Sequence, residues 1–267
     1  SIGLFFDNLE DLNTQELTES IQLYSIDENL SDSNWLTKWF TVTQTKMNQF
    51  KSVELVSCFV SLSSLEIHPS KEWLNQWQLS SQKQMESLTP QDLYNCIRSF
   101  SQLKTHPNSE WLQEWLLYSK KNLDFFNLSQ IASSLSSLAN LGIHPDIDWL
   151  TQWFTRVFQD YKNFKFIELS NCLHAFTMLT IPLPKDFIDL ISDSFEHFEI
   201  NGKILRQIYT YNMVMKIYGF PQSIIHTVKI DFDSIKEATD NKISLLESDV
   251  KKYLDLFCYN ENGKWIP

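Results

Sequence analysis

The sequence predicts an all-α protein, a right-handed α-solenoid of stacked 38-residue two-helix repeats. One observation is a pair of tryptophan columns, each with a period of 38 residues: Trp35, Trp73, Trp111 and Trp149, and then Trp39, Trp77, Trp115 and Trp153. The other is a second segment in every period whose apolar residues have helical spacing. Units of this length cannot bury their apolar faces alone and must stack on their neighbours.

The first helix of each unit is predicted from its start. Pro69, Pro107 and Pro145 each stand before a capping residue, which is followed by an acid and Trp-Leu. The capping column accepts hydrogen bonds from free amides of the first turn and holds Asp32, Ser70, Asn108 and Asp146. The acid column suits the positive end of the helix dipole and holds Glu72, Glu110, Asp148 and Asp186. We therefore interpret these acids as helix-start residues and not as catalysts.

The second helix starts most clearly at Thr89, where Pro90 and Asp92 complete a capping pattern. The apolar residues that follow lie at offsets of 0, 3, 4, 7 and 10, as Leu93, Cys96, Ile97, Phe100 and Leu103. That spacing places them on one face of a helix, whereas a strand would alternate. Equivalent sets occur in the other copies.

Three regions follow from this pattern. Residues 1–14 are predicted to be an acidic amino-terminal arm, since residues 1–30 hold seven acids and no basic residue. Residues 15–220 are predicted to form the repeat array, in which Phe187, Ile191 and Ile217 occupy degraded repeat columns, and Pro221 holds the next proline column directly after it. Residues 221–267 are predicted to form a helical carboxy-terminal cap, because terminal units of a repeat array are atypical.

Composition excludes several classes. The net charge of -11 leaves no bulk basic surface for nucleic-acid phosphates. Cys58, Cys96 and Cys172 share one repeat column, and equivalent helices lie too far apart for disulfides, so we expect buried thiols. No clustered Cys or His spacing indicates a metal site. No apolar run is long enough to span a membrane, and no cofactor or small-molecule substrate is indicated.

No catalytic motif is present. The chain has no Gly-rich phosphate loop, no Gly-x-Ser-x-Gly and no His-Glu-x-x-His, so we do not expect an enzyme. His68, His106 and His144 align before the prolines and are expected to pack in turns. The tryptophans share a helix face with leucines, which favours core packing over base stacking.

The repeat resembles that of the octotricopeptide repeat (OPR) family. The resemblance rests on Pro69/Glu72/Trp73, Pro107/Glu110/Trp111 and Pro145/Asp148/Trp149, with Leu141-Gly142 as the closest copy of the family's Leu-Gly. The second and third prolines of the family signature are absent, and Asp148 replaces its Glu. The resemblance covers residues 15–220 and implies an α-solenoid that binds RNA in mitochondria or chloroplasts, in RNA processing, translation or organellar ribosomes. Many relatives carry a carboxy-terminal nuclease-like domain, which the last 47 residues do not resemble, so binding without cleavage is implied.

If RNA is read one base per unit, the reading residues should be polar and variable at fixed columns. On the second helix the columns that face away from the core hold Ser57, Asn95, Ser133 and Asn171; then Val60, Arg98, Ser136 and His174; then Ser64, Gln102, Asn140 and Met178. The first helix offers a rival set, Thr37, Asn75, Gln113 and Thr151. An ordinary solvated surface is the alternative for both sets. Basic residues that could reach phosphates are scattered, at Lys51, Lys104, Lys120, Lys121, Arg156, Lys162 and Lys165.

The sequence therefore favours a non-catalytic protein that binds single-stranded or structured RNA in an organelle, as part of a mitochondrial ribosome or another ribonucleoprotein. Mitochondrial localisation, with the chloroplast as the alternative, is implied by the resemblance alone. The runner-up hypothesis is a scaffold subunit that binds other proteins of a larger complex without RNA contact.

Overall fold

The chain is helical throughout the part that its structure describes. A computed structural model describes residues 8–24, 33–160, 163–195, 202–220 and Ile225. These residues form eleven α-helices and no strand, which confirms the all-α prediction. The chain divides into two compact units, residues 1–164 and residues 165–267, and each is considered by itself.

Four first helices and four second helices alternate along the first unit. Its first helices are α3 (Ser33–Lys46), α5 (Lys71–Gln82), α7 (Ser109–Asn122) and α9 (Ile147–Asp160). Its second helices are α2 (Thr14–Tyr24), α4 (Ser52–Ser64), α6 (Pro90–Gln102) and α8 (Leu128–Asn140). The predicted alternation of first and second helices is confirmed for these residues.

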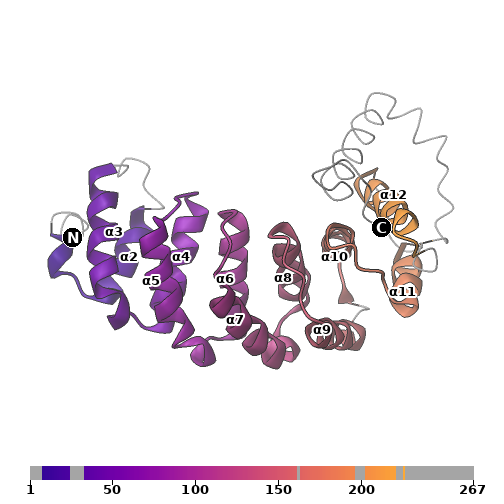
Figure 1. The fold of residues 1–267 in the computed structure, drawn as a ribbon, viewed down its shortest axis with the longest axis horizontal. Helices are drawn as coiled ribbons and strands as arrows, with labels where there is room; N and C mark the ends of the chain where they lie inside the picture. Colours follow the sequence, from indigo (N-terminus) through magenta and orange to yellow (C-terminus); the bar gives the residue numbers. More distant parts are fainter. Residues whose placement is uncertain (1–7, 25–32, 161–162, 196–201, 221–224, 226–267) are drawn as a thin grey trace, which may run out of the picture. The chain divides into compact units, whose positions relative to one another are not determined.

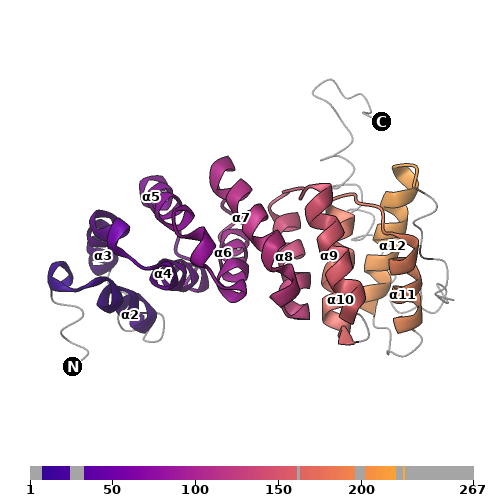
Figure 2. The ribbon, with the colours of Figure 1, turned by 90° about the horizontal axis from the view of Figure 1, so that it is seen from below.

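The helices of the first unit form two layers. In one layer α2 contacts α4, α4 contacts α6 and α6 contacts α8; in the other, α3, α5, α7 and α9 contact one another in the same order (Figures 1 and 2). The layers join where each second helix meets the first helix that follows it. The second helices pack against each other more extensively than the first helices do.

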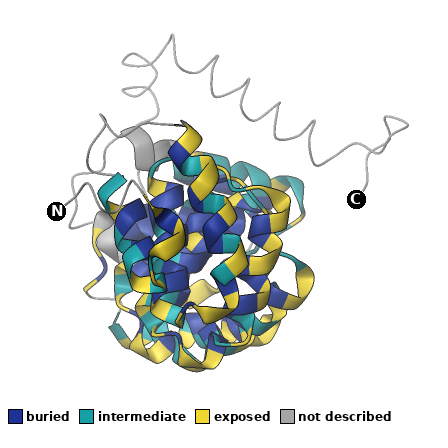
Figure 3. Ribbon diagram, turned by 90° about the vertical axis from the view of Figure 1, so that its left-hand side faces the viewer, coloured by how far each residue is buried: buried dark blue, intermediate teal, exposed yellow. Residues whose placement is uncertain are grey.

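Both tryptophan columns lie in the core between the layers. All eight side chains are buried, and seven of them are almost fully enclosed. Figure 3 shows the buried residues between the helices and the exposed residues on the outside. Trp35 belongs to this core and stacks on Tyr24 with ring centroids 4.8 Å apart. The prediction that these rings pack in the core is therefore confirmed.

The first tryptophan column bonds to the preceding repeat. The indole N–H of Trp73 donates to the Thr43 hydroxyl at 2.9 Å, and Trp111 and Trp149 donate in the same way to Ser81 and Ser119. Each acceptor stands 30 residues before its donor. Because a buried polar group without a partner is costly, each bond ties one first helix to the next.

The second tryptophan column bonds to the backbone. Its four indole N–H groups donate to carbonyl oxygens 22 residues earlier, at distances of 2.8 to 3.1 Å. The acceptors lie on the second helices, at Leu17, Leu55, Leu93 and Ile131. These bonds join the two layers, since every donor belongs to a first helix.

The predicted helix starts are confirmed wherever the chain is described. The side chains of Ser70, Asn108 and Asp146 accept the backbone N–H three residues later, that of Trp73, Trp111 and Trp149. Pro69, Pro107 and Pro145 directly precede these caps and are partly or fully buried. Asp32 lies outside the described residues.

A further repeat column was missed from the sequence. A 3-10 turn follows the first helices α3, α5 and α7, and its first residue is buried at Met47, Met85 and Leu123. Leu9 begins an equivalent turn, Leu9–Asp11, one period before Met47. The residues of the predicted acidic arm that are described thus include a repeat-like turn. The Lys46 ammonium donates to the backbone oxygens of Glu10 and Leu12 and holds this segment on α3.

The second helices α4, α6 and α8 are each followed by a residue in the left-handed conformation. Glu66, Lys104 and Gly142 have φ of 56°, 49° and 64°, and Thr180 repeats the feature in the second unit with 54°. The residue after each one donates its N–H to the carbonyl five positions back, which completes a Schellman motif. Glycine, which adopts this conformation without strain, occupies only one of these ends, and the hydrogen bonds offset the strain at the other three.

The second unit repeats the pattern in degraded form. Its helices are α10 (Phe166–Met178), α11 (Lys185–Phe195) and α12 (Gly202–Ile217). Phe187 and Ile191 are buried in the predicted tryptophan columns. The Tyr211 hydroxyl accepts the Leu183 N–H at 2.8 Å and fixes the turn before α11. The predicted cap, residues 221–267, lies outside the described residues except for Ile225.

No helix in the described ranges is long and apolar enough to cross a bilayer.

Cys58, Cys96 and Cys172 are buried free thiols, as their shared column predicted. Burial raises the pKa of the Cys58 thiol from 9.0 to about 12; the Thr18 hydroxyl lowers it and the Glu54 carboxylate raises it. Burial likewise raises the pKa of Cys96 and Cys172, with smaller upward contributions from Asp92 and Glu168.

We predict an energetic coupling between Thr43 and Trp73. Thr43→Val should lower the free energy of unfolding by about 1–3 kcal/mol, because it leaves a buried indole N–H without an acceptor. Trp73→Phe completes a double-mutant cycle. The double variant should lose less free energy of unfolding than the two single variants lose together, by about 1 kcal/mol or more. Urea denaturation measures all four free energies.

Trp115→Phe provides the control for this cycle. The Trp115 indole donates to the Leu93 carbonyl and shares no partner with Thr43. Its combination with Thr43→Val should be additive to within about 0.5 kcal/mol. Additivity in the Thr43/Trp73 cycle would contradict the coupling.

We predict that the buried thiols make stability fall in alkaline solution. The unfolded thiol ionises near its ordinary pKa of 9.0, whereas the folded thiol stays protonated, so the folded state binds more protons. The free energy of unfolding should therefore fall as pH rises above 9, by about 1.4 kcal/mol per thiol at pH 10. Between pH 8 and pH 10, the free energy of unfolding of Cys96→Ala should therefore fall by about 1.4 kcal/mol less than that of the unmodified protein. Urea denaturation at both pH values measures the two changes. An unchanged pH dependence in this variant would contradict the assignment.

Candidate functional site

The outward face of the second helices gathers the predicted site residues of the first unit. On α4 this face holds Val53, Ser57, Val60 and Ser64; on α6, Gln91, Asn95, Arg98 and Gln102; on α8, Ser129, Ser133, Ser136 and Asn140. All twelve side chains are exposed or half-buried. Because α4, α6 and α8 are neighbours, they form one continuous surface, which we call the second-helix face.

The composition of the second-helix face differs from that of the chain. Nine of its twelve side chains are Ser, Asn or Gln, and none is acidic, although the chain carries a net charge of -11. Arg98 is its one charged residue. The first-helix surface, in contrast, exposes Glu72, Glu110 and Asp148. An anionic ligand would therefore meet exposed carboxylates on the first-helix surface, but none among the twelve side chains of the second-helix face.

Two predicted site residues belong to the second unit. Asn171 and His174 lie half-buried on α10, each with contacts inside the protein. They occupy the same repeat columns as Asn95 and Arg98.

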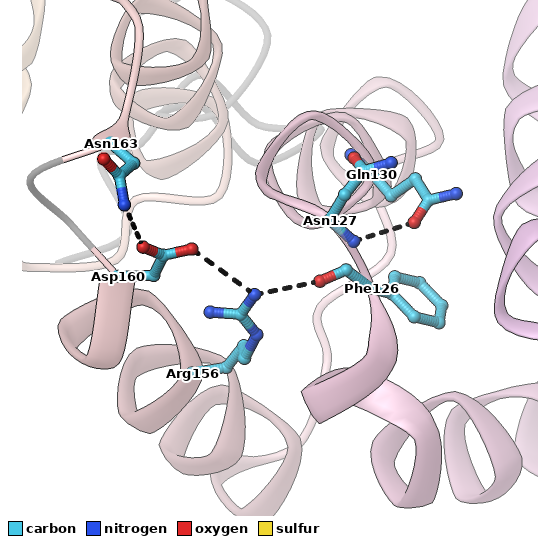
Figure 4. A network of polar contacts seen from close by, with 6 residues as sticks. All are labelled: Phe126, Asn127, Gln130, Arg156, Asp160 and Asn163. Atoms are coloured by element: carbon cyan, nitrogen blue, oxygen red, sulfur yellow. Dashed lines mark hydrogen bonds and ion pairs between the residues drawn. The ribbon is translucent and has the colours of Figure 1, made fainter.

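A chain of side-chain amides crosses from α8 to α6. The Asn127 N–H donates to Gln130 Oε1 at 2.8 Å, the capping contact drawn in Figure 4. Gln130 Nε2 then donates to Gln91 Oε1 at 2.7 Å, and Gln91 Nε2 donates to Asn95 Oδ1 at 2.9 Å. Since a backbone N–H can only donate, it sets the direction of every later bond in the chain. Asn95 thus accepts through Oδ1, which leaves its NH₂ group to donate.

Gln91 and Gln130 were not selected from the sequence. They occupy different repeat columns, and the alignment of columns could not bring them together. Gln130 was recognisable as the third residue of a capping box, but its free amide group has no sequence signature.

Arg98 and Gln102 project from the same stretch of α6 as Asn95. Both are exposed, and within the described residues neither the Arg98 guanidinium nor the Gln102 amide has a hydrogen bond or an ion pair. Asn140 reaches back from α8 to the Ser101 hydroxyl at 3.4 Å. The α6 portion of the face therefore combines a fixed amide with an unengaged guanidinium.

The rival set lies on the opposite layer. Thr37, Asn75, Gln113 and Thr151 are exposed on α3, α5, α7 and α9. Beside them, Leu79 on α5 and Leu117 on α7 occupy one repeat column and are 51% and 42% exposed. This surface thus mixes acids, lysines and apolar side chains.

Arg156, Lys120 and Lys121, which the sequence offered as phosphate contacts, each contact another group of the protein. Arg156 Nη2 donates to the Phe126 carbonyl at 3.2 Å and lies 3.8 Å from the Asp160 carboxylate (Figure 4). Lys120 lies 3.8 Å from Asp148, and the Lys121 ammonium lies 4.8 Å from the centre of the Tyr118 ring. Lys51 and Lys104 are exposed in turns, Lys165 belongs to the second unit, and Lys162 lies outside the described residues.

The aligned histidines lie in turns, as predicted. His68, His106 and His144 are exposed, and His106 Nε2 donates to the Leu141 carbonyl at 2.7 Å. Because Leu141 ends the next second helix, this bond links adjacent repeats. The described residues include no group of three or more His, Cys, Asp or Glu side chains arranged to hold a metal ion.

Comparison with known proteins adds no relative to these observations. No protein-family model matches the chain, and a search of curated proteins finds no significant match.

Proposed function

We propose that the protein binds single-stranded or structured RNA on the second-helix face and does not cleave it. The observation that carries the proposal is an acid-free surface of nine uncharged polar side chains in a chain of net charge -11. Hydroxyl and amide groups can hydrogen-bond to base edges and ribose hydroxyls without a net positive charge. An acid-free surface also avoids repulsion of RNA phosphates.

The packing of the first unit supports the second helices as the RNA-facing layer. We propose that the repeats continue as a right-handed α-solenoid of the OPR type. In a curved stack, the layer whose helices pack more closely lies on the inner side. The closer packing of α4, α6 and α8 therefore supports the second-helix face as the concave surface. Repeat arrays use such surfaces for binding.

The cellular setting of the proposal comes from the OPR resemblance. We propose a ribonucleoprotein of the mitochondrion, or alternatively of the chloroplast, with a ribosome as one candidate assembly. The buried tryptophans support recognition by hydrogen bonds, because enclosed indole rings cannot stack on bases.

A second proposed function is that of a protein-binding scaffold. It is supported by the exposed leucines at one repeat column, Leu79 and Leu117, on the neighbouring helices α5 and α7. Exposed apolar groups that lie together are typical of contact surfaces for other proteins. Since these leucines lie on the first-helix layer, RNA and protein binding are compatible.

We predict that charge added to the second-helix face weakens RNA binding. In the Asn95→Glu/Ser133→Glu variant, two carboxylates would repel phosphates, and affinity for a single-stranded oligonucleotide of 12 nucleotides should fall at least about tenfold. Fluorescence anisotropy at low ionic strength measures the affinity.

The matched control is Asn75→Glu/Gln113→Glu, which adds the same charge to exposed positions of the first-helix layer. This control should fall less than about threefold in affinity, because the carboxylates lie on the other layer. Equal losses in both variants, or no binding by the unmodified protein, would contradict the proposal.

We predict that Leu79→Glu/Leu117→Glu separates the protein from a larger assembly while RNA affinity is retained. In gradient sedimentation of extracts that express this variant, the protein should move from the particle fractions to the free-protein fractions. Circular dichroism checks its folding. Unchanged sedimentation with a particle would contradict the scaffold role.

A further inference from the structure

The α6 portion of the second-helix face offers hydrogen-bond donors of fixed direction. Arg98 carries only donors, and no residue of the described ranges engages its guanidinium. Asn95 stands three residues before Arg98 on the same helix, so the two side chains are surface neighbours.

The amide chain settles which group Asn95 presents. An isolated asparagine could turn either its oxygen or its nitrogen toward a ligand. Here its oxygen accepts from Gln91, which accepts from Gln130, whose own oxygen accepts the Asn127 backbone N–H. Reversal of Asn95 would place two NH₂ groups against each other. Gln91 therefore occupies the Asn95 oxygen, and the Asn95 NH₂ group is the group left to donate to a ligand.

A ligand that fits Asn95 and Arg98 together must carry adjacent acceptors. Of the two purines, only guanine has two neighbouring acceptors, O6 and N7, on one edge, and arginine is their commonest partner. Adenine places an amino group beside N7, and this group would meet the N–H groups of Asn95. Guanine therefore suits this pair and adenine does not.

We propose that the α6 repeat selects guanine, with Arg98 donating to one of its acceptors and Asn95 to the other. The inference rests on the proposed RNA binding and adds to it a base preference at one repeat. Gln91 and Gln130 act as positioning residues, since they contact Asn95 or each other and set the direction of its amide.

The first test compares oligonucleotides of 12 nucleotides: oligouridine, and the same strand with a single central guanosine or adenosine. By fluorescence anisotropy, the guanosine strand should bind about tenfold more tightly than the adenosine strand. Arg98→Ala should remove this preference, because it should lose more affinity for the guanosine strand than for the adenosine strand or oligouridine.

The second test reverses the amide. In Gln91→Glu, residue 91 can only accept, so Asn95 should donate to it and present its oxygen to the ligand. That oxygen suits the adenine amino group, so the order of the two strands should change to favour adenosine. Ser129→Glu is the control, because Ser129 holds the same repeat column on α8 and is equally the second residue of its helix. It should weaken both strands without changing their order.

The outcomes separate the two proposals. Binding without guanosine preference, or an equal loss on all strands in Arg98→Ala, would show a phosphate contact and overturn the guanine assignment alone. An unchanged order in Gln91→Glu would overturn the role of the amide chain. No binding of any strand by the unmodified protein would overturn both the RNA-binding function and the guanine inference. Thermal unfolding of each variant confirms that it is folded.

Discussion

The buried indole N–H is the constraint on which the first unit depends. Tryptophan brings a large apolar surface into the core, but its N–H must find an acceptor there. Trp73, Trp111 and Trp149 of the first column, and the four tryptophans of the second, meet this need in different directions. The first reaches a hydroxyl of the preceding first helix, at Thr43, Ser81 or Ser119, and the second reaches a carbonyl of the preceding second helix. Together these bonds fix each repeat against its predecessor.

The same constraint explains a paired change in the sequence. The next member of the hydroxyl column is Val157, and the next member of the first tryptophan column is Phe187. Donor and acceptor are thus lost together, so neither position carries a buried polar group that requires the other. The change falls where the repeat pattern begins to degrade.

The indole rings are enclosed, so a ligand would meet only the outer surfaces of the protein. The second-helix face and the surface of the first-helix layer differ in chemistry. The second-helix face is polar, free of acids and organised around α6, whereas the first-helix layer exposes Leu79, Leu117 and several acids. The proposed RNA binding and the proposed protein binding would therefore use separate layers. An amide chain that starts at a backbone N–H gives one part of the second-helix face a fixed hydrogen-bonding polarity.

The sequence predicted the elements that recur every 38 residues and missed the contacts that do not. The caps at Ser70 and Asn108, the buried tryptophans and the buried thiols were recognisable because each repeats in a column. The 3-10 turns were missed because Met85 and its equivalents have no distinctive local signature. The Gln130–Gln91 contact was missed because it joins different columns and depends on the packing of α6 on α8. Repeat alignment placed Arg156 among the free basic residues, and only the structure shows its partners.

The most direct test of this account is a ¹H–¹⁵N NMR titration of the protein with the guanosine-containing oligonucleotide. We expect the side-chain signals of Asn95 and Gln102 and the Arg98 Nε–H signal to shift as RNA is added. The indole N–H signals of Trp73, Trp111 and Trp149 should stay in place, because those groups are bonded inside the core. Shifts of the indole signals, with the α6 side chains unaffected, would contradict the separation of a tryptophan core from a polar recognition face.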